Sequence, residues 1–459
     1  MSGWASTFRD RLVGSRFVRN VGRLWAAQGV ALAAGAIQGV LVARWLGPSL
    51  FGTAALVIAV PSVVATIFDA RAADAAIRYL GEFSAANDSR RASAFAKLGY
   101  LLDVGASSAA LVVVVVIAPW AASHIAHADV AGLMVLAAAA LVLRAPAVTS
   151  EAILVTLERY PTLARVQVTT AVMKALAAVA LVGLGYGIGG MVVGWAMGSI
   201  AEGVVMTIVA TRAGRSAWRT SWWSSSLTSL GDRRGEIARF VVWTDLSSLL
   251  GVATKQMDVI IVGSFAGTAA AGFYRLAVSL GQLGGFVAGP VQSILYQRFS
   301  RVGVGRPREL HDEAARAATH VSVPLAALGL LAIPLTPWAV RTIAGAAYAP
   351  AGTLAQIMVL LEAVWFAFLW VRPLVFTLGE VRLWTVSNLA VAALSLAGYL
   401  VIVPAAGPAG AAWVRFATST FAQVLPLAVV LTRYERGRYE STSGVKAIRP
   451  MAEVTGDRR

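Results

Sequence analysis

Apolar runs of about 20 residues recur along the chain, separated by short polar segments. A run of that length is what an α-helix needs to cross the hydrocarbon core of a bilayer. The pattern predicts an all-α integral membrane fold with about twelve spans, and ten or fourteen are the alternatives. The expected spans are 25–46, 52–72, 94–118, 130–150, 162–184, 187–211, 239–262, 269–294, 317–338, 351–371, 383–403 and 409–432.

Composition supports a membrane protein. Of the 459 residues, 58% are hydrophobic and 14% are charged, whereas soluble domains average about 45–50% apolar and about 25% charged residues. Cysteine is absent, which excludes disulfides and thiolate chemistry. The four histidines form no HExxH motif, and no GxxxxGK[ST] phosphate loop occurs. We therefore predict no metal and no cofactor, and transport driven by a gradient.

The basic residues that give the net charge of +16 follow the membrane topology. Segments 124–129, 185–190, 263–272 and 404–408 contain neither Lys nor Arg. The intervening connections are rich in arginine, as expected for cytoplasmic loops under the positive-inside rule. Both termini are therefore predicted to be cytoplasmic. This placement of charge also argues against nucleic acid as a partner, and the basic N-terminal segment is expected to lie on membrane lipid.

The longest basic loop divides the chain into two halves of six spans. We expect a juxtamembrane segment at 1–24, an N-terminal lobe at 25–211 and an inter-lobe loop at 212–238. A C-terminal lobe follows at 239–432, and the basic tail 433–459 is expected to be disordered.

A weak repeat relates the two halves. The sequence LGPSLFGT at 46–53 resembles AGTAAAGF at 266–273, with glycines five residues apart in each copy. Both copies fall at the turn between the first and second spans of their half. Six spans per half give the halves the same orientation. Parallel repeats of this kind occur in secondary transporters that bind substrate between two lobes around a central cavity.

Two motifs carry a resemblance to a known family. The run VARWLGPSLFG at 42–52 looks like the ARxLGPxxFG signature of bacterial polysaccharide flippases. These flippases belong to the multidrug/oligosaccharidyl-lipid/polysaccharide exporter superfamily. In the second half, QMDVIIVGSF at 256–265 followed by AGFY at 271–274 is similar to the family's xxDxxxLGxF…GxY run.

The resemblance implies a V-shaped bundle in the bacterial cytoplasmic membrane. It implies that the chain moves an undecaprenyl-diphosphate-linked oligosaccharide from the inner to the outer leaflet by alternating access. Such a flippase serves O-antigen, capsule or exopolysaccharide assembly, and its partners are the lipid-linked glycan and other assembly proteins. The chain is then not an enzyme.

Two other functions stay open. An ion-coupled exporter of small cationic drugs would share the fold, but it should have acidic residues in its cavity, and basic candidates outnumber acidic ones within these spans. A membrane glycan polymerase or ligase would need a large extracytoplasmic loop, and every outside connection is short.

Charged residues within the spans are the candidate functional groups, because a charge at membrane depth is costly unless it is paired or lines a watery cavity. Counting residues from each turn places four of them at matching depths on neighbouring helices. Lys174 and Glu202 differ in depth by about four residues, which is within reach of a long lysine side chain. The expected pairs are Asp258 with Arg275, Asp103 with Arg144, and Lys174 with Glu202. Each pair could be a structural salt bridge or one that breaks and re-forms during transport.

Four cations are candidates for the substrate cavity, where they would suit a diphosphate or an acidic glycan. They are Arg275, Lys255, Arg415 and Lys174. Lys255 and Arg415 could instead extend to the outer interface. Asp258 and Glu362 are the candidates for proton or ion coupling. We expect Arg275→Ala and Arg415→Ala to impair glycan export while the protein stays in the membrane.

Two further sets of residues complete the candidate sites. Alternating charges at the cytoplasmic end of the second span predict a gate, formed by Asp69, Arg71, Asp74 and Arg78. The signature turn is expected to be structural, and consists of Arg44, Gly47, Pro48 and Gly52.

Overall fold

The computed structural model describes residues 16–68, 72–219, 222–233, 235–239, 257–303 and 307–435. Helices joined by short turns account for nearly all of these residues, and no strand occurs among them. Most of the expected juxtamembrane segment, most of the basic tail and the first part of the seventh expected span lie outside this set.

The helices of the first half are α2 (Arg16–Phe68), α3 (Ala72–Ala85), α4 (Ser89–His124), α5 (Ala131–Arg144), α6 (Ala147–Thr156), α7 (Tyr160–Gly183) and α8 (Gly187–Trp218). A 3-10 turn, η1 (Leu227–Arg233), lies in the inter-lobe loop. The second half contains α10 (Met257–Gly281), α11 (Gly284–Val302), α12 (Pro307–Ala317), η2 (Ala318–Ser322), α13 (Val323–Ala332), η3 (Ile333–Leu335), α14 (Thr336–Ala344), η4 (Ala346–Tyr348), α15 (Ala351–Ala367), α16 (Val371–Thr377) and α17 (Val381–Glu435).

Within the described ranges, nine helical stretches are long and apolar enough to cross a bilayer. Three of them bend at a glycine with positive φ: α2 at Gly47, α10 at Gly267 and α17 at Gly407. A residue with a Cβ would be strained there, so glycine allows the chain to turn without an intervening loop. Counting the two arms of each bent helix separately gives twelve helical segments in the described ranges, in agreement with the prediction of about twelve spans.

Proline explains where single expected spans are broken. The expected span 130–150 consists of α5 and α6, which are separated at Ala145 and Pro146. The span expected at 317–338 runs through a π turn and a 3-10 turn as well as α-helix, and Pro334 lies in η3. Proline donates no backbone hydrogen bond, so a helix kinks or changes type near it.

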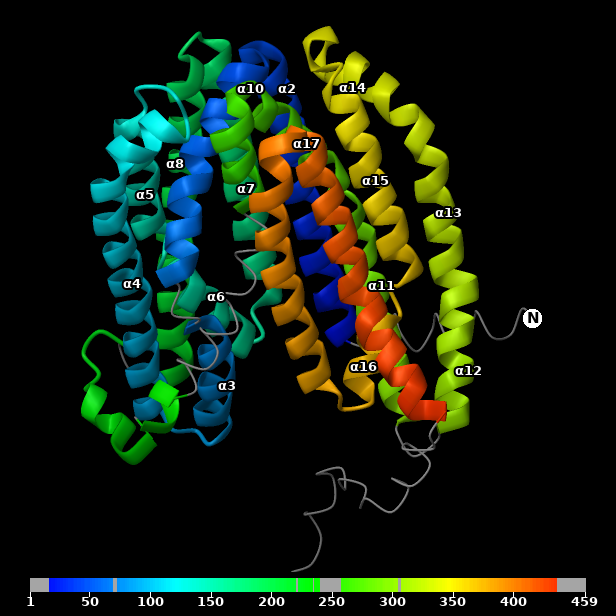
Figure 1. The fold of residues 1–459 in the computed structure, drawn as a ribbon. Coiled ribbons are helices and arrows are strands. Elements are labelled where there is room, and N and C mark those ends of the chain that lie inside the picture. Colours follow the sequence, from blue (N-terminus) through cyan, green and yellow to red (C-terminus); the bar gives the residue numbers. More distant parts are fainter. Residues whose placement is uncertain are drawn as a thin grey trace, which may run out of the picture.

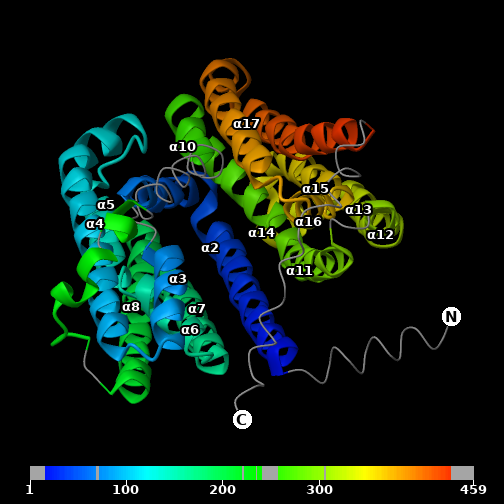
Figure 2. The ribbon, with the colours of Figure 1, turned by 90° about the horizontal axis from the view of Figure 1, so that it is seen from below.

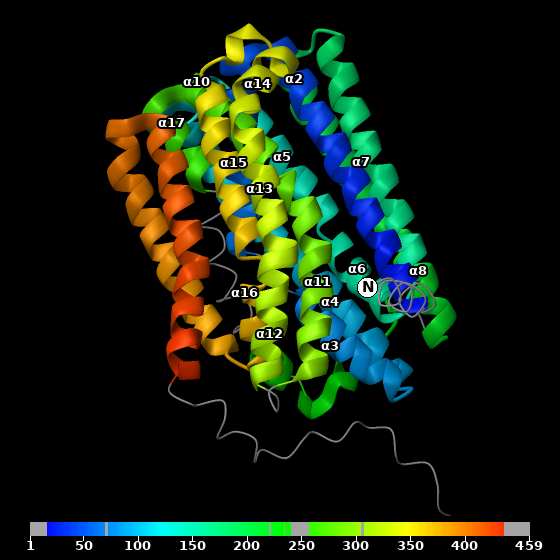
Figure 3. The same ribbon diagram turned by 90° about the vertical axis from the view of Figure 1, so that its right-hand side faces the viewer.

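The helices form two lobes (Figure 1). Helices α3 to α8 pack against one another, and α11 to α17 form the second group. Seen along the bundle, the first arm of α2 passes between the two groups (Figure 2). That arm runs beside α7, while α2 also packs extensively against α10 (Figure 3). The two lobes therefore meet mainly through α2 and α10, the first helical elements of each half in the described residues.

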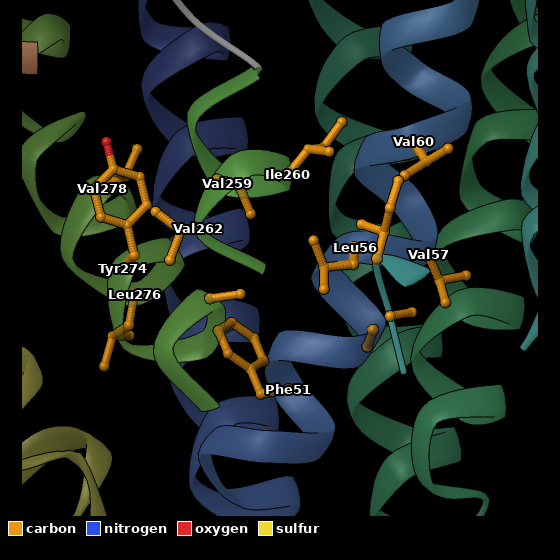
Figure 4. Close-up of a cluster of buried hydrophobic side chains, with 14 of the residues drawn as sticks. Phe51, Leu56, Val57, Val60, Val259, Ile260, Val262, Tyr274, Leu276 and Val278 are labelled. Carbon is orange, nitrogen blue, oxygen red and sulfur yellow. The ribbon is translucent and has the colours of Figure 1, made fainter. Parts of the chain in front are cut away.

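An apolar core joins the lobes near the bends of α2 and α10 (Figure 4). Leu56 and Val60 of α2 lie opposite Val259, Ile260 and Val262 of α10, and all of them are buried. Lipid tails are as apolar as these side chains, so in a bilayer close packing stabilises such a contact more than exclusion of water does. The end of the bundle that holds Gly47 and Gly267 is called the bend end below.

The two copies of the repeat contact each other reciprocally at the bend end. A Cβ at Gly52 would lie 1.8 Å from the carbonyl oxygen of Thr268, and a Cβ at Gly272 would lie 2.1 Å from that of Pro48. In the sequence repeat, Gly52 corresponds to Gly272 and Pro48 to Thr268. The bends also match, with φ and ψ of 76° and 169° at Gly47 and of 84° and 173° at Gly267. The structure thus confirms the predicted parallel repeat.

Candidate functional site

Asp258 is the centre of a buried polar cluster in the second lobe. Its carboxylate is fully buried and accepts hydrogen bonds from Arg415 of α17 and from the Tyr274 hydroxyl, the latter at 2.9 Å. The other carboxylate oxygen accepts the backbone N–H of Val259 at 2.8 Å. Both oxygens therefore have donors, and the charge of Asp258 is balanced by a mostly buried guanidinium.

One prediction about this cluster is wrong, and one ion pair was not predicted. Arg415, to which sequence analysis assigned no partner, is paired with Asp258. Arg275, expected to pair with Asp258, is exposed and makes no ion pair within the described residues. The bend at Gly407 accounts for the difference, because it folds the second arm of α17 back along the lobe and brings Arg415 to the level of Asp258.

Glu362 of α15 is the other acidic candidate in this lobe. One of its carboxylate oxygens is buried and has no hydrogen-bond partner in the part of the chain that the structure describes. Gly284 leaves the space for it, since a Cβ there would lie 2.8 Å from that oxygen. A carboxylate held in this way is costly unless it binds a proton or a cation.

The first lobe holds a separate charged cluster around Glu202 of α8. The Arg144 guanidinium donates to both Glu202 oxygens at 2.9 and 2.8 Å, and the Lys174 ammonium lies 3.8 Å from Glu202. This confirms the predicted Lys174–Glu202 pair and gives Arg144 a partner that sequence analysis did not assign. Gly198 allows the close approach, because a Cβ there would lie 2.3 Å from the Cβ of Lys174.

A cavity of about 370 Å³ lies beside this cluster. Its lining includes Asp103, Arg144 and Lys174, together with Ser62 and Ser199. Asp103 is buried and accepts the backbone N–H of Thr149 at 3.0 Å, at the start of α6. Asp103 and Arg144, which were expected to pair, thus line the same cavity. Lys255 lies outside the described residues. Of the other three predicted cavity cations, Lys174 lines this cavity, and Arg275 and Arg415 do not.

A large cavity, of about 870 Å³, lies between the first arm of α2 and the second lobe. The segment around α11 contributes most of its lining, and α2 and α16 contribute the rest. Its polar side chains are mainly amides: Gln28, Gln282, Gln292 and Gln297. Arg372 is the one charged residue among the described residues of the lining, and its guanidinium lies 5.2 Å from the centre of the Phe376 ring.

Sequence analysis missed this cavity because it weighed only charged residues within the spans. A usable signal was present. Gly285, Gly289, Gln292 and Tyr296 follow one another at three- and four-residue spacing, which places them on one face of a helix. Glutamine is itself unfavourable in hydrocarbon, so a polar stripe within an apolar segment indicates a watery surface.

The expected gate lies at the opposite end of the bundle from the bends. Asp69 and Arg71 lie outside the described residues, and of Asp74 only the backbone is described. The Arg78 guanidinium lies 3.7 Å from Glu236 in the inter-lobe loop. Arg233, in the same loop, donates to Glu82 of α3 at 2.7 Å and to Glu236 at 2.8 Å. These ion pairs hold the inter-lobe loop against α3 of the first lobe.

This cluster should respond to acid. Hydrogen bonds from Arg233 hold the pKa of Glu82 and of Glu236 below the ordinary value of 4.5. A lowered carboxyl pKa stabilises the folded arrangement above about pH 4.5, and that contribution is lost as the pH falls through the lowered value. A fluorophore attached to the cysteine of Ala238→Cys would report whether the inter-lobe loop is bound to α3. We expect its signal to show a bound loop at pH 7 and a released loop below about pH 4.5.

The Arg233→Ala variant should give the low-pH signal already at neutral pH, since it removes both hydrogen bonds. Arg215→Ala is the matched control, because this exposed arginine at the end of α8 makes no ion pair in the described chain. An unchanged signal in Arg233→Ala would show that apolar contacts alone hold the loop.

The residues of the signature turn form part of the bend end, as predicted for a structural role. Gly47 has the positive φ at which α2 bends. Gly52 lies in close contact with the backbone of Thr268, and Pro48 lies in close contact with Gly272. Ser49 Oγ lies 3.1 Å from Thr268 Oγ1, so a side-chain hydrogen bond also joins the two repeats. Arg44 is exposed.

Comparison with known proteins identifies the family. A model of the family described as "Polysaccharide biosynthesis protein" matches residues 41–352, which is more than half of the chain. The chain belongs to this family. The matched region extends from the first repeat copy to the start of α15, so it contains both copies and the Asp258 cluster up to Tyr274. No curated protein matches the chain.

Solved structures of the same fold include transporters of lipids and of drugs. An inward closed conformation of the lipid II flippase MurJ has a TM-score of 0.69 at 13% identity, covering 92% of this chain and 90% of that one. An inward-facing multidrug resistance MATE transporter of the MOP superfamily has a TM-score of 0.65 at 13% identity, with 91% and 96% covered.

A third structure is a MOP superfamily transporter from Pyrococcus furiosus Vc1, whose binding pocket is described as having reverse polarity. Its TM-score is 0.61 at 13% identity, with 92% of this chain and 96% of that chain covered. At such identities the likeness establishes the fold, which this chain shares with these three proteins, and it confirms the predicted all-α membrane class. The chain is thus a multi-pass membrane protein of a polysaccharide biosynthesis family, and its fold is shared with transporters and a lipid flippase.

Proposed function

We propose that this protein flips an undecaprenyl-diphosphate-linked oligosaccharide from the inner to the outer leaflet of the bacterial cytoplasmic membrane. Its termini would then be cytoplasmic, and its product would feed surface polysaccharide assembly. Family membership supports a role in polysaccharide synthesis. The observation that carries the proposal is the cavity of about 870 Å³, which contains amides and an arginine but no carboxylate among its described lining residues.

The depth of this cavity suits a lipid headgroup. Gln28 lies nineteen residues before Gly47 on the first arm of α2. At a rise of about 1.5 Å per residue, the amide is about 28 Å from the bend end. The hydrocarbon core of a bilayer is about 30 Å thick, so the cavity lies near the headgroups of the leaflet opposite the bend end. The phosphates and sugars of a lipid in that leaflet lie at the same level.

The arrangement of the lobes suits alternating access. The repeats are in close contact at the bend end, while the large cavity lies toward the other end. Substrate would enter from the cytoplasmic leaflet in this state. Separation of the Gly52 and Gly272 contacts would then open the outer side. Glu362, with its buried oxygen lacking a partner in the described chain, is the residue that we propose for proton or ion coupling.

An exporter of cationic drugs is the main competing function. Such a protein needs carboxylates in its binding cavity, because a cation is held by opposite charge. The described lining of the large cavity has none, and Asp258 is occupied by Arg415. The lining therefore favours an anionic or neutral polar headgroup over a cation. A glycan polymerase or ligase is the third possibility, and the likeness of the fold to a lipid flippase and to drug transporters favours transport over it.

A reversible lock at the bend end tests the proposed function. The chain contains no cysteine, so Ser49→Cys with Thr268→Cys introduces a single possible disulfide where the two hydroxyl oxygens are 3.1 Å apart. In cells that depend on this protein, oxidation should stop export and lipid-linked oligosaccharide should accumulate in the inner leaflet. Reduction should restore export.

Each single-cysteine variant is the control and should export under both conditions. Normal export by the fully oxidised double variant would contradict alternating access through the bend end. If loss of the gene leaves surface glycan and its lipid-linked precursor unchanged but raises sensitivity to cationic drugs, the flippase assignment is wrong.

A further inference from the structure

The large cavity has the chemistry of a saccharide site. The four glutamines that line it come from two sides: Gln28 from α2, and Gln282, Gln292 and Gln297 from the segment around α11. An amide side chain offers two donors and one acceptor group, which matches the mixed donors and acceptors of sugar hydroxyls. Trp25, Tyr296 and Phe376 add aromatic surface to the same cavity.

The side-chain amides of these glutamines make no hydrogen bonds that stabilise the described part of the fold. None of the four side-chain amides makes a hydrogen bond to another group in the described residues. A polar side chain that is not paired within the protein is hydrogen-bonded by water or by a ligand. Four unpaired amides around one cavity thus indicate a surface built to donate and accept hydrogen bonds from an occupant.

The aromatic side chains are arranged for close contact. The Trp25 ring packs over Gly289, where a Cβ would lie 3.3 Å from the ring. Gly289 thus brings α2 close to α11 and fixes the indole at one wall of the cavity. Aromatic rings offer wide, rigid apolar surfaces, which suit the C–H faces of sugar rings.

Charge restricts the occupant further. Arg372 is the only charged residue in the described lining, and it makes no ion pair within the described chain. A guanidinium is a preferred ligand for phosphate because its N–H groups match the phosphate oxygens in pairs. With Arg372 engaged by a phosphate, no second cation of this lining remains for an acidic sugar.

We propose that this cavity selects the saccharide part of the substrate, binding an uncharged oligosaccharide through Gln28, Gln282, Gln292 and Gln297 and a phosphate through Arg372. This inference rests on the proposed function and adds the class of glycan to it. The volume of about 870 Å³ lies within the range of about 300–1,000 Å³ that ligand pockets usually have.

The test compares three lipids on the purified full-length protein in nanodiscs. The first is undecaprenyl diphosphate alone, the second carries an uncharged oligosaccharide, and the third carries an oligosaccharide of equal length containing a uronic acid. The protein should bind the second lipid more tightly than the other two. Gln28→Leu and Gln292→Leu should each weaken binding of the second lipid by about 2- to 12-fold, the usual range for one lost hydrogen bond.

The controls separate recognition of the sugar from folding. Gln28→Leu and Gln292→Leu should leave binding of undecaprenyl diphosphate alone unchanged, which also shows that they are folded. Gln38→Leu is the matched control, because Gln38 lies on the same arm of α2 but outside the lining of the cavity. Arg372→Gln should weaken binding of all three lipids.

Three results would overturn the inference. These are equal binding of the first two lipids, tightest binding of the third, and an equal effect of the glutamine variants on all lipids. In each of these cases the proposed flippase function would still stand, because the wild-type protein binds the lipid diphosphate. Failure of the wild-type protein to bind any of the three lipids would instead remove the proposed function together with this inference.

Discussion

Replacing Arg415 with alanine is expected to destabilise the folded protein by about 3–5 kcal/mol. Asp258 is fully buried, and Arg415 is the only cation that pairs with it among the described residues. Removal of one partner from a buried ion pair leaves an uncompensated charge, which typically costs about that much. The Tyr274 hydroxyl would still donate to Asp258 but would not neutralise it. We expect the variant to lose its monodisperse peak in detergent at a clearly lower temperature than the wild type.

The neighbouring arginine gives the matched control. Arg275→Ala removes a guanidinium from the same helix as Asp258, but Arg275 is exposed and has no ion pair in the described chain. Its stability should therefore be close to that of the wild type. The double variant Asp258→Asn with Arg415→Ala removes the charge as well as its partner and should recover part of the lost stability. Wild-type stability of Arg415→Ala alone would show that the carboxylate is not charged in the folded protein.

This expectation changes how export assays on these residues should be interpreted. Sequence analysis predicted that both arginine variants would impair export with the protein still in the membrane. The structure retains that prediction for Arg275 alone. Loss of export in Arg415→Ala would be confounded by loss of folded protein, whereas the double variant would separate the two. Export by a stable double variant would show that the Asp258–Arg415 pair is structural.

The features that sequence predicted best depend on local pattern. The lengths of the spans and the bends at Gly47 and Gly267 can each be predicted from a single segment of about 20 residues or less. This is possible because bilayer thickness and backbone strain constrain each segment separately. The Lys174–Glu202 pair also follows from one hairpin, in which depth on each helix is counted from the same turn. For such features the sequence is sufficient.

Contacts across the lobe could not be predicted in this way. Asp258 and Arg415 are on α10 and α17, and they meet because α17 bends at Gly407. The direction of that bend is set by packing against the whole lobe. Glu202 shows the same limit, since Arg144 reaches it from α5. The large cavity needs three separated elements, so only its polar stripe on α11 is visible in sequence.

Substituting alanine for Gly52 is expected to prevent the bend end from closing and thus to abolish most export. The new Cβ would lie 1.8 Å from the carbonyl oxygen of Thr268, a backbone atom that cannot move without shifting α10. Overpacking of this kind typically costs about 1–3 kcal/mol, which lowers the population of the closed state about 5- to 150-fold. Gly272→Ala should have the same effect, because its new Cβ would clash with the carbonyl oxygen of Pro48 in the equivalent contact of the repeat.

The effect can be measured as the rate of disulfide formation in the Ser49→Cys/Thr268→Cys background, which reports how often the bend end is closed. Gly39→Ala is the matched control, since it lies on the same helix and a Cβ there would have no atom within 4 Å. That variant should cross-link and export normally, and it should be slightly more stable because alanine favours helix over glycine. If Gly52→Ala cross-links as fast as Gly39→Ala, the lobes can close without the glycine contact. Slow cross-linking with normal export would mean that transport does not pass through the closed bend end.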